Sequence, residues 1–162
     1  MTNEYIMKTA LMQSAIDSNC DPQDFLDSEN KVFISKKNPG ARKYLELPHY
    51  CDFTSYGTNV VISASAELAV KAKSYADRFP PEHCFETPAI HMLNGELFEF
   101  GLGVCFMAEY FLPDTDDIKF ISCSYPIKVL TGKQLDGLYQ PVWQNALCQK
   151  KKRTRRTCGR SI

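Results

Sequence analysis

The sequence lacks the long apolar runs and glycine-rich loops that mark several large classes of protein. No stretch approaches the roughly 18 consecutive apolar residues that a membrane-spanning helix needs, so we expect no such helix. The N-terminus has no basic segment followed by an apolar block, so no secretory signal is predicted. GxGxxG, GxxxxGKS/T and GxSxG are all absent, which leaves nucleotide binding through such loops unsupported.

The seven cysteines contain no Cys-x-x-Cys pair and have wide, irregular spacing. Together with the missing signal, this favours reduced thiols in a cytoplasmic protein. His83, Cys84 and His91 lie within nine residues of one another. Adjacent His and Cys side chains are poor geometry for a single ion, so we expect no metal site and assign His83 as a hydrogen-bonded residue ahead of a helix.

The stretch from Glu82 to Asp114 carries the strongest structural pattern. Thr87 is the expected N-cap of a helix, and Pro88 suits its first position. The following run VCFMAEYFL, residues 104–112, is apolar on both alternating faces apart from Glu109. This pattern predicts a buried central strand, around which the rest of the fold packs.

The other segments predict an α+β fold. We expect helices over 3–18 and directly after Asp21-Pro22, a strand over 31–35, and a helix over 66–79 capped by Ser65, with Lys71, Lys73 and Asp77 on its outer side. Three extended runs lie between that strand and the last helix, separated by Pro48 and Gly57, and predict an antiparallel meander. These runs are residues 41–47, 50–56 and 59–64.

The zero net charge hides a strong asymmetry. Residues 150–162 hold seven of the 19 basic residues and no acid, so the remaining 149 residues carry 12 basic against 19 acidic side chains. We therefore expect a basic, disordered tail over 149–162, preceded by a region at 1–124 and a short β-α start at 125–148. The tail has no interleaved aromatic residues and the body is acidic, so we do not assign nucleic-acid binding.

Glu109 is the one candidate catalytic residue. A lone carboxylate in an apolar strand must be paired, protonated or facing a cavity, and such groups serve as acids or bases. The simpler alternative is a structural ion pair with a basic residue at the end of the strand.

Four stretches stand out beyond this: EHCFETP (82–88), CFMAEYFLPD (105–114), YPIKVLT (125–131) and WQNAL (143–147). In combination they resemble a bacterial group within the GNAT superfamily of N-acetyltransferases, in which an α/β region precedes a C-terminal acetyltransferase domain. The resemblance implies that residues 125–148 begin that domain and that Tyr139 and Trp143 line the acceptor side of its cleft. It also implies acetyl-CoA as the cofactor of the full-length family and a small-molecule or peptide amine as acceptor.

The family holds the pyrophosphate of acetyl-CoA on an Arg/Gln-x-x-Gly-x-Gly/Ala loop that opens a helix. RRTCGR, residues 155–160, has one glycine in the wrong register. We therefore expect a truncated member in which acetyl-CoA does not bind tightly, and whose last residues lie outside the family's frame. The alternative is a non-catalytic module that binds a ligand or partner in a pocket framed by the meander and the helix of residues 88–100.

An incomplete acetyltransferase fold would also leave apolar side chains uncovered. Val142, Trp143 and Leu147 belong to a predicted helix that lacks its sheet, so the sequence predicts an exposed apolar patch that favours self-association. The membrane is not an expected partner.

Overall fold

The computed structural model describes residues 2–116, 124–126, 128, 130, 134, 138 and 140–143. The chain divides into two compact units, residues 1–118 and 119–162. The first unit is α+β, with three α-helices and a small mixed sheet. Most of the predicted β-α start and the whole basic tail lie outside the described residues.

The sheet is built around β3 (Val60–Ala64), all five residues of which are buried. β1 (Lys31–Ile34) pairs with it in parallel and β2 (Cys51–Ser55) pairs with it antiparallel, which gives the order β1-β3-β2. A central strand with both faces covered requires apolar residues on both faces. The sequence VVISA meets this requirement, with Ser63 as its one polar member.

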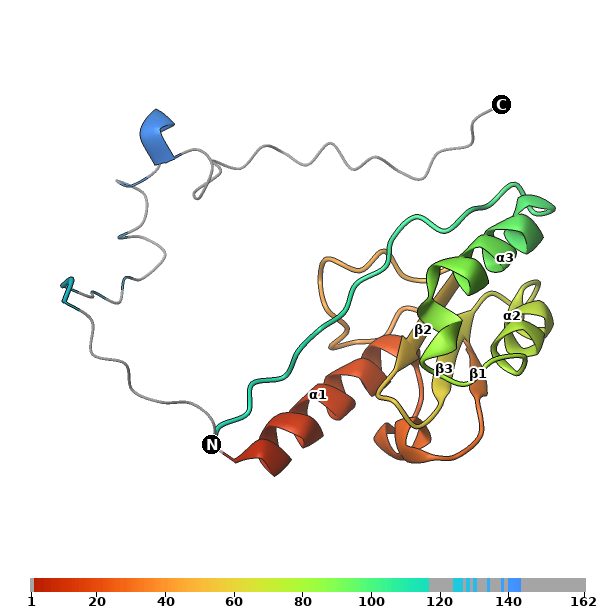
Figure 1. The fold of residues 1–162 in the computed structure, drawn as a ribbon, viewed down its shortest axis with the longest axis horizontal. Helices are drawn as coiled ribbons and strands as arrows, with labels where there is room; N and C mark the ends of the chain where they lie inside the picture. The colour runs from red at the N-terminus through yellow and green to blue at the C-terminus, as the bar shows by residue number, and fades with distance from the viewer. Residues whose placement is uncertain are drawn as a thin grey trace. The chain divides into compact units, whose positions relative to one another are not determined.

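The two faces of β3 carry two separate clusters of buried side chains. Val60, Ile62 and Ala64 pack with α2 (Ala69–Ala76) and α3 (Thr87–Phe98), whereas Val61 packs with α1 (Asn3–Ser18) and Phe25. The sheet therefore lies between α1 on one face and α2 and α3 on the other (Figure 1). This alternation follows from the period of two along a strand.

The predicted meander is only half right. β2 and β3 form the antiparallel hairpin that was expected, with Gly57 at a φ of 101° in the connecting turn. Residues 41–47 form turns instead of a strand. The side chain of Asp17, at the end of α1, binds both the backbone N–H and the guanidinium of Arg42, which holds this run against α1 and away from the sheet.

The predicted helix start at Asp21 is confirmed, whereas the predicted cap at Ser65 is not. Asp21 accepts from the N–H of Gln23 and Asp24 accepts from the N–H of Asp21, a capping box that opens the short 3-10 helix Pro22–Leu26 as predicted. The predicted cap by Ser65 is wrong, because its Oγ has no hydrogen-bond partner and only its carbonyl accepts, from Leu68 and Ala69.

The predicted cap by Thr87 is also wrong. Thr87 is the first residue of α3 and Pro88 the second, while Glu86 precedes the helix without a side-chain capping bond. The proline signal located this helix start to within one residue, because its missing N–H costs nothing in a first turn. The N-cap position lies one residue earlier than predicted, at Glu86.

The predicted buried strand at residues 104–112 is wrong. The segment forms neither helix nor strand, and it runs from the end of α3 back to the start of α1 (Figure 1). The N–H of Val104 donates to Oδ1 of Asn94 at 2.9 Å, and Asn3 binds Asp114 and Thr115 at the other end. Residues 104–112 are apolar on both alternating faces apart from Glu109, but β3 occupies the central position of the sheet.

Candidate functional site

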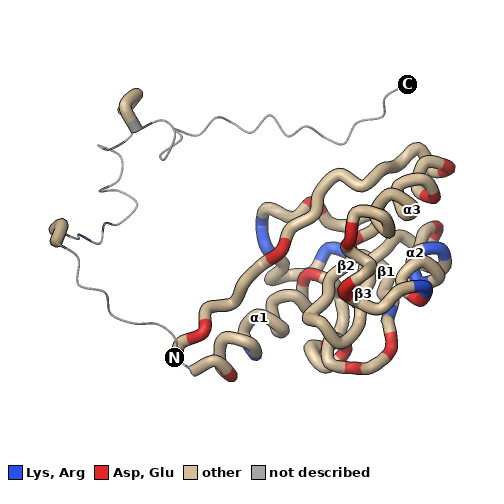
Figure 2. Tube along the Cα trace, in the orientation of Figure 1, with Lys and Arg blue, Asp and Glu red and all other residues tan. Residues whose placement is uncertain are grey.

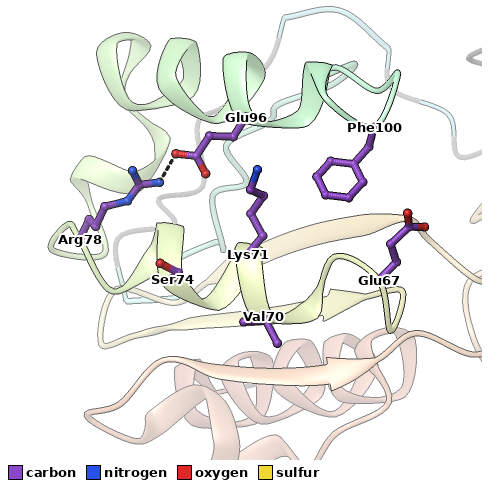
Figure 3. A pocket seen from close by; sticks show the side chains of 7 residues that line it. All are labelled: Glu67, Val70, Lys71, Ser74, Arg78, Glu96 and Phe100. Carbon is purple, nitrogen blue, oxygen red and sulfur yellow. Dashed lines mark hydrogen bonds and ion pairs between the residues drawn. The ribbon is translucent and has the colours of Figure 1, made fainter.

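An open groove of about 520 Å³ lies between α2 and the end of α3 (Figure 3). Its lining mixes charged groups of both signs with one aromatic ring. The lining residues are Glu67, Val70, Lys71, Ser74, Arg78, Glu96 and Phe100.

The helical period places these residues together. Glu67, Lys71, Ser74 and Arg78 are spaced at i, i+4, i+7 and i+11, so they form one stripe along α2 and its flanking turns. The opposite side of α2, which includes Ala72, Tyr75 and Ala76, is buried against the sheet. On α3 and the turn after it, Glu96 and Phe100 have the same i, i+4 relation and face this stripe.

Two ion pairs cross the groove from one helix to the other. Nη2 of Arg78 lies 2.6 Å from Oε1 of Glu96, and Nζ of Lys71 lies 2.5 Å from Oε2 of Glu99. Figure 2 shows the underlying division, with basic positions on α2 and acidic positions on α3. The side chains are partly exposed, so each pair contributes about 0.2–1 kcal/mol to stability and serves mainly to set the charge of the groove.

One end of the groove places an ammonium group against an aromatic ring. Nζ of Lys71 lies 5.1 Å from the centroid of the Phe100 ring, within the range of a cation-π interaction. Glu67 lies at this same end (Figure 3) and makes no ion pair with any residue that the structure describes. The groove thus offers an aromatic face and a spare carboxylate around a primary ammonium.

The far end of α2 is tied to α3 through the turn His83–Phe85. The buried hydroxyl of Tyr75 donates to the carbonyl oxygen of Cys84 at 2.8 Å. Burial raises the pKa of the Tyr75 hydroxyl to about 12 and also raises the pKa of the Cys84 thiol. The EHCFETP stretch therefore connects the two groove helices, and the hydrogen bond from Tyr75 to Cys84 holds its turn against α2.

His83 has the role that the sequence predicted. Its Nδ1 lies 2.9 Å from Oε2 of Glu86, three residues on, and this hydrogen bond raises the pKa of the imidazole. Cys84 is buried beside it, with its sulfur directed at the carbonyl oxygen of Ala76. Among the described residues no three His, Cys, Asp or Glu side chains are grouped as metal ligands would be.

A second hollow, of about 430 Å³, lies at the carboxyl ends of β1 and β3. Ser35, His49, Tyr50 and Ser65 supply its polar lining. The Ser35 hydroxyl already accepts from the N–H of His49 at 2.8 Å, so it serves to hold the loop before β2. Because His49 is the only ionisable side chain here besides the exposed Tyr50, this hollow is the poorer candidate for chemistry.

The described residues that line the groove differ from the site residues that the sequence predicts. Glu109 lies in the exposed segment after α3, so the apolar enclosure expected around it does not exist. Trp143 belongs to the short 3-10 helix Pro141–Trp143 of the second unit, and Tyr139 lies outside the described residues. The roles of Tyr139 and Trp143 as cleft-lining residues remain predictions.

The groove residues were missed although their pattern was visible. Lys71 was assigned to the outer, solvated side of its helix, which is correct for the helix alone. The stripe from Glu67 to Arg78 became a groove wall only because α3 lies across from it, and no periodicity within one helix reveals which second helix will do so.

Within the described part of the chain no helix combines the length and the apolar character needed to cross a membrane. Comparison with known proteins adds no relative: no protein-family model, no curated protein and no solved structure matches the chain.

Proposed function

We propose that the first unit is the substrate-side region of a GNAT-type N-acetyltransferase and that the groove between α2 and α3 receives the amine acceptor. Two lines of reasoning support the proposal: the combination of motifs that resembles the family, and a groove whose chemistry suits an alkylammonium ion. In the full reaction the deprotonated amine nitrogen attacks the thioester carbonyl carbon of acetyl-CoA. The carbon–sulfur bond breaks and coenzyme A leaves as its thiol.

The observation that carries the acceptor assignment is the position of Lys71. Its side chain is itself a primary alkylamine, and it lies over the Phe100 ring with its ammonium paired to Glu99. A substrate amine of similar shape finds the same ring, with Glu67, which makes no ion pair to a described residue, as a counter-ion at that end of the groove. Lys71 then competes with the substrate for the ring.

The expected affinity is low. A cation-π contact at a partly exposed ring contributes about 0.5–1 kcal/mol, and one or two exposed ion pairs add about 0.2–1 kcal/mol each. The total is about 0.7–3 kcal/mol, and its upper end corresponds to a dissociation constant on the order of 10 mM. Such weak binding is what an acceptor subsite without the remainder of an active site would give.

The test is an NMR titration of the 15N-labelled chain with butylamine at neutral pH, where the amine is charged. We expect saturable shifts confined to amides of α2 and of residues 96–101. Butanol, which has the same shape without the charge, should give no saturable shifts. Equal responses to the two ligands, or no saturation with butylamine, would contradict the acceptor assignment.

Single substitutions in the groove test which charged groups bind butylamine in this titration. Glu67→Gln should weaken butylamine binding by about 1.4- to 5-fold, because it removes a counter-ion. Lys71→Gln should strengthen binding, because it frees the ring and Glu99. Lys73→Gln is the control, since Lys73 pairs with Asp77 on the same helix but does not line the groove. A change with Lys73→Gln as large as that with Lys71→Gln would show a general charge effect.

The cofactor part of the proposal is tested separately by isothermal titration with acetyl-CoA. We propose that this chain does not bind acetyl-CoA tightly, because the glycine loop of the family is not recognisable in its sequence. Saturable heat with a micromolar dissociation constant would contradict this, and acetylation of an amine by the chain alone would overturn it.

The alternative is a non-catalytic ligand- or partner-binding module. The groove favours it because all the described residues that line the groove belong to the first unit. Such a module must hold its ligand without help from a second domain, so it predicts a micromolar ligand for the groove. Discovery of an uncharged or anionic ligand with that affinity would favour the module over the acetyltransferase.

A further inference from the structure

The segment of residues 104–112 is extended (Figure 1) and attached at both ends; Val104 packs against the core, and residues 105–112 are exposed in the part of the chain that the structure describes. Its first residue is held by Asn94 and the residues just after it by Asn3, with hydrogen bonds of 2.7–2.9 Å. Between these two attachments the segment forms no ladder with the three strands that the structure describes. Among the described residues, it is therefore a stretch of backbone that lies outside the sheet and has both ends attached.

The segment exposes an unusual amount of apolar surface. Phe106, Tyr110 and Phe111 are 73%, 75% and 89% exposed, and Met107 and Leu112 are also exposed. With about 150–250 Å² for each aromatic side chain, these five present roughly 600 Å². That area, which is distributed over both faces of the segment, lies at the upper end of the apolar patches of ordinary monomers and below the roughly 800 Å² that each partner contributes to a stable interface.

The pattern of side chains is self-complementary. Val104, Phe106, Ala108, Tyr110 and Leu112 share one face of an extended chain, and none of them is charged. In an antiparallel pair with a second copy centred on Ala108, Phe106 of each copy lies opposite Tyr110 of the other. Glu109 then lies opposite Met107, so the two carboxylates are not directly opposed.

We propose that this chain forms a homodimer through residues 104–112, which pair antiparallel with the same residues of a second copy about a two-fold axis at Ala108. Pairing gives the segment ladder hydrogen bonds to a second copy and places Phe106 of each copy beside Tyr110 of the other. The contact is isologous, so it closes at two copies and does not propagate into a fibre.

The test is sedimentation velocity of the full chain from about 1 to 200 μM. The wild-type chain should shift from monomer to dimer across this range, and Phe106→Asp should remain monomeric because it places two carboxylates in the uncharged face. Phe98→Asp is the control, since Phe98 is 81% exposed but lies on α3 outside the segment. A wild-type chain that stays monomeric, or a Phe106→Asp chain that still dimerises, would overturn the proposal.

The register has its own test. Directly opposed residues of an antiparallel pair have Cα atoms about 4.5–5.5 Å apart, within reach of a disulfide, whereas diagonal neighbours are too far apart. Ala108→Cys should therefore give a cross-linked dimer on mild oxidation beyond that of the parent chain. Met107→Cys, which lies opposite Glu109, should not. Efficient cross-linking of Met107→Cys alone would overturn the proposed two-fold.

Discussion

Replacing Tyr75 by Phe tests whether one hydroxyl holds the two groove helices together. The side chain is 1% exposed, and its O–H donates to the carbonyl oxygen of Cys84 at 2.8 Å. The ring also contacts Phe53 and Phe79, with centroid distances of 5.7 and 5.4 Å. Tyr75→Phe keeps the ring contacts and removes only the donor, so it isolates the hydrogen bond.

The expected loss in the free energy of unfolding is about 1–3 kcal/mol, because a buried carbonyl is left without its donor. Tyr75→Ala should lose about 3–5 kcal/mol, since it also leaves a cavity among the three rings. Tyr50→Phe is the control: Tyr50 is 68% exposed, and the change should stay within about 0.5 kcal/mol.

Urea denaturation followed by circular dichroism at 222 nm measures these differences. The single tryptophan, Trp143, lies in the second unit, so its fluorescence would not report on this region directly. A Tyr75→Phe chain as stable as the wild type would refute the role of the hydroxyl. A loss as large as that of Tyr75→Ala would show that the ring packing itself depends on the hydrogen bond.

Three further predictions concern the first unit. Phe25→Ala should lower the free energy of unfolding by about 3–5 kcal/mol in urea denaturation, because Phe25 is fully buried beneath α1; a loss below about 1 kcal/mol would contradict this packing. Asn59→Ala should lose about 2–4 kcal/mol in the same assay, since its buried amide donates to two backbone carbonyls at 2.8 Å; a neutral substitution would disprove these bonds. Glu86→Gln should lower the pKa of His83 in an NMR titration of its imidazole, and an unchanged pKa would contradict the ion pair. Because Glu86 raises that pKa above 6.5, the pair's contribution to stability should be present below pH 6.5 and be lost as the pH rises through the raised value.

Local signals located most helices of the first unit correctly. The helix over residues 3–18 has the predicted bounds, and Asp21-Pro22 opens a helical turn as expected. These features depend on interactions within four residues, so a single sequence contains the information. The length of α2 was overestimated, since it spans Ala69–Ala76 within the expected 66–79.

Features that depend on distant partners were harder to predict. The runs VVISA and VCFMAEYFL are both apolar on both faces, but only the first is buried in the sheet. Periodicity shows that a run suits burial; it does not show which of two such runs takes the central position. The parallel pairing of β1 with β3 was missed for the same reason, since a long crossover separates these strands.

The candidate site was also hard to predict from the sequence, because it depends on residues that are distant along the chain. The charged stripe of α2 can be read from the sequence, but its function as a groove wall depends on Glu96 and Phe100, which are presented by a helix more than twenty residues away from Lys71. Glu109 was singled out because of its apolar neighbours along the chain. In the folded unit those neighbours face solvent, so the argument for an unusual carboxylate loses its basis.

The most direct test of the account is the butylamine titration of Lys71→Gln beside that of the wild-type chain. We expect saturable shifts on both sides of the groove in each chain, with a dissociation constant on the order of 10 mM or above for the wild type and a lower one when the competing ammonium is removed. Identical affinity in the two chains, or shifts that never saturate, would contradict the claim that this groove is built to receive an amine.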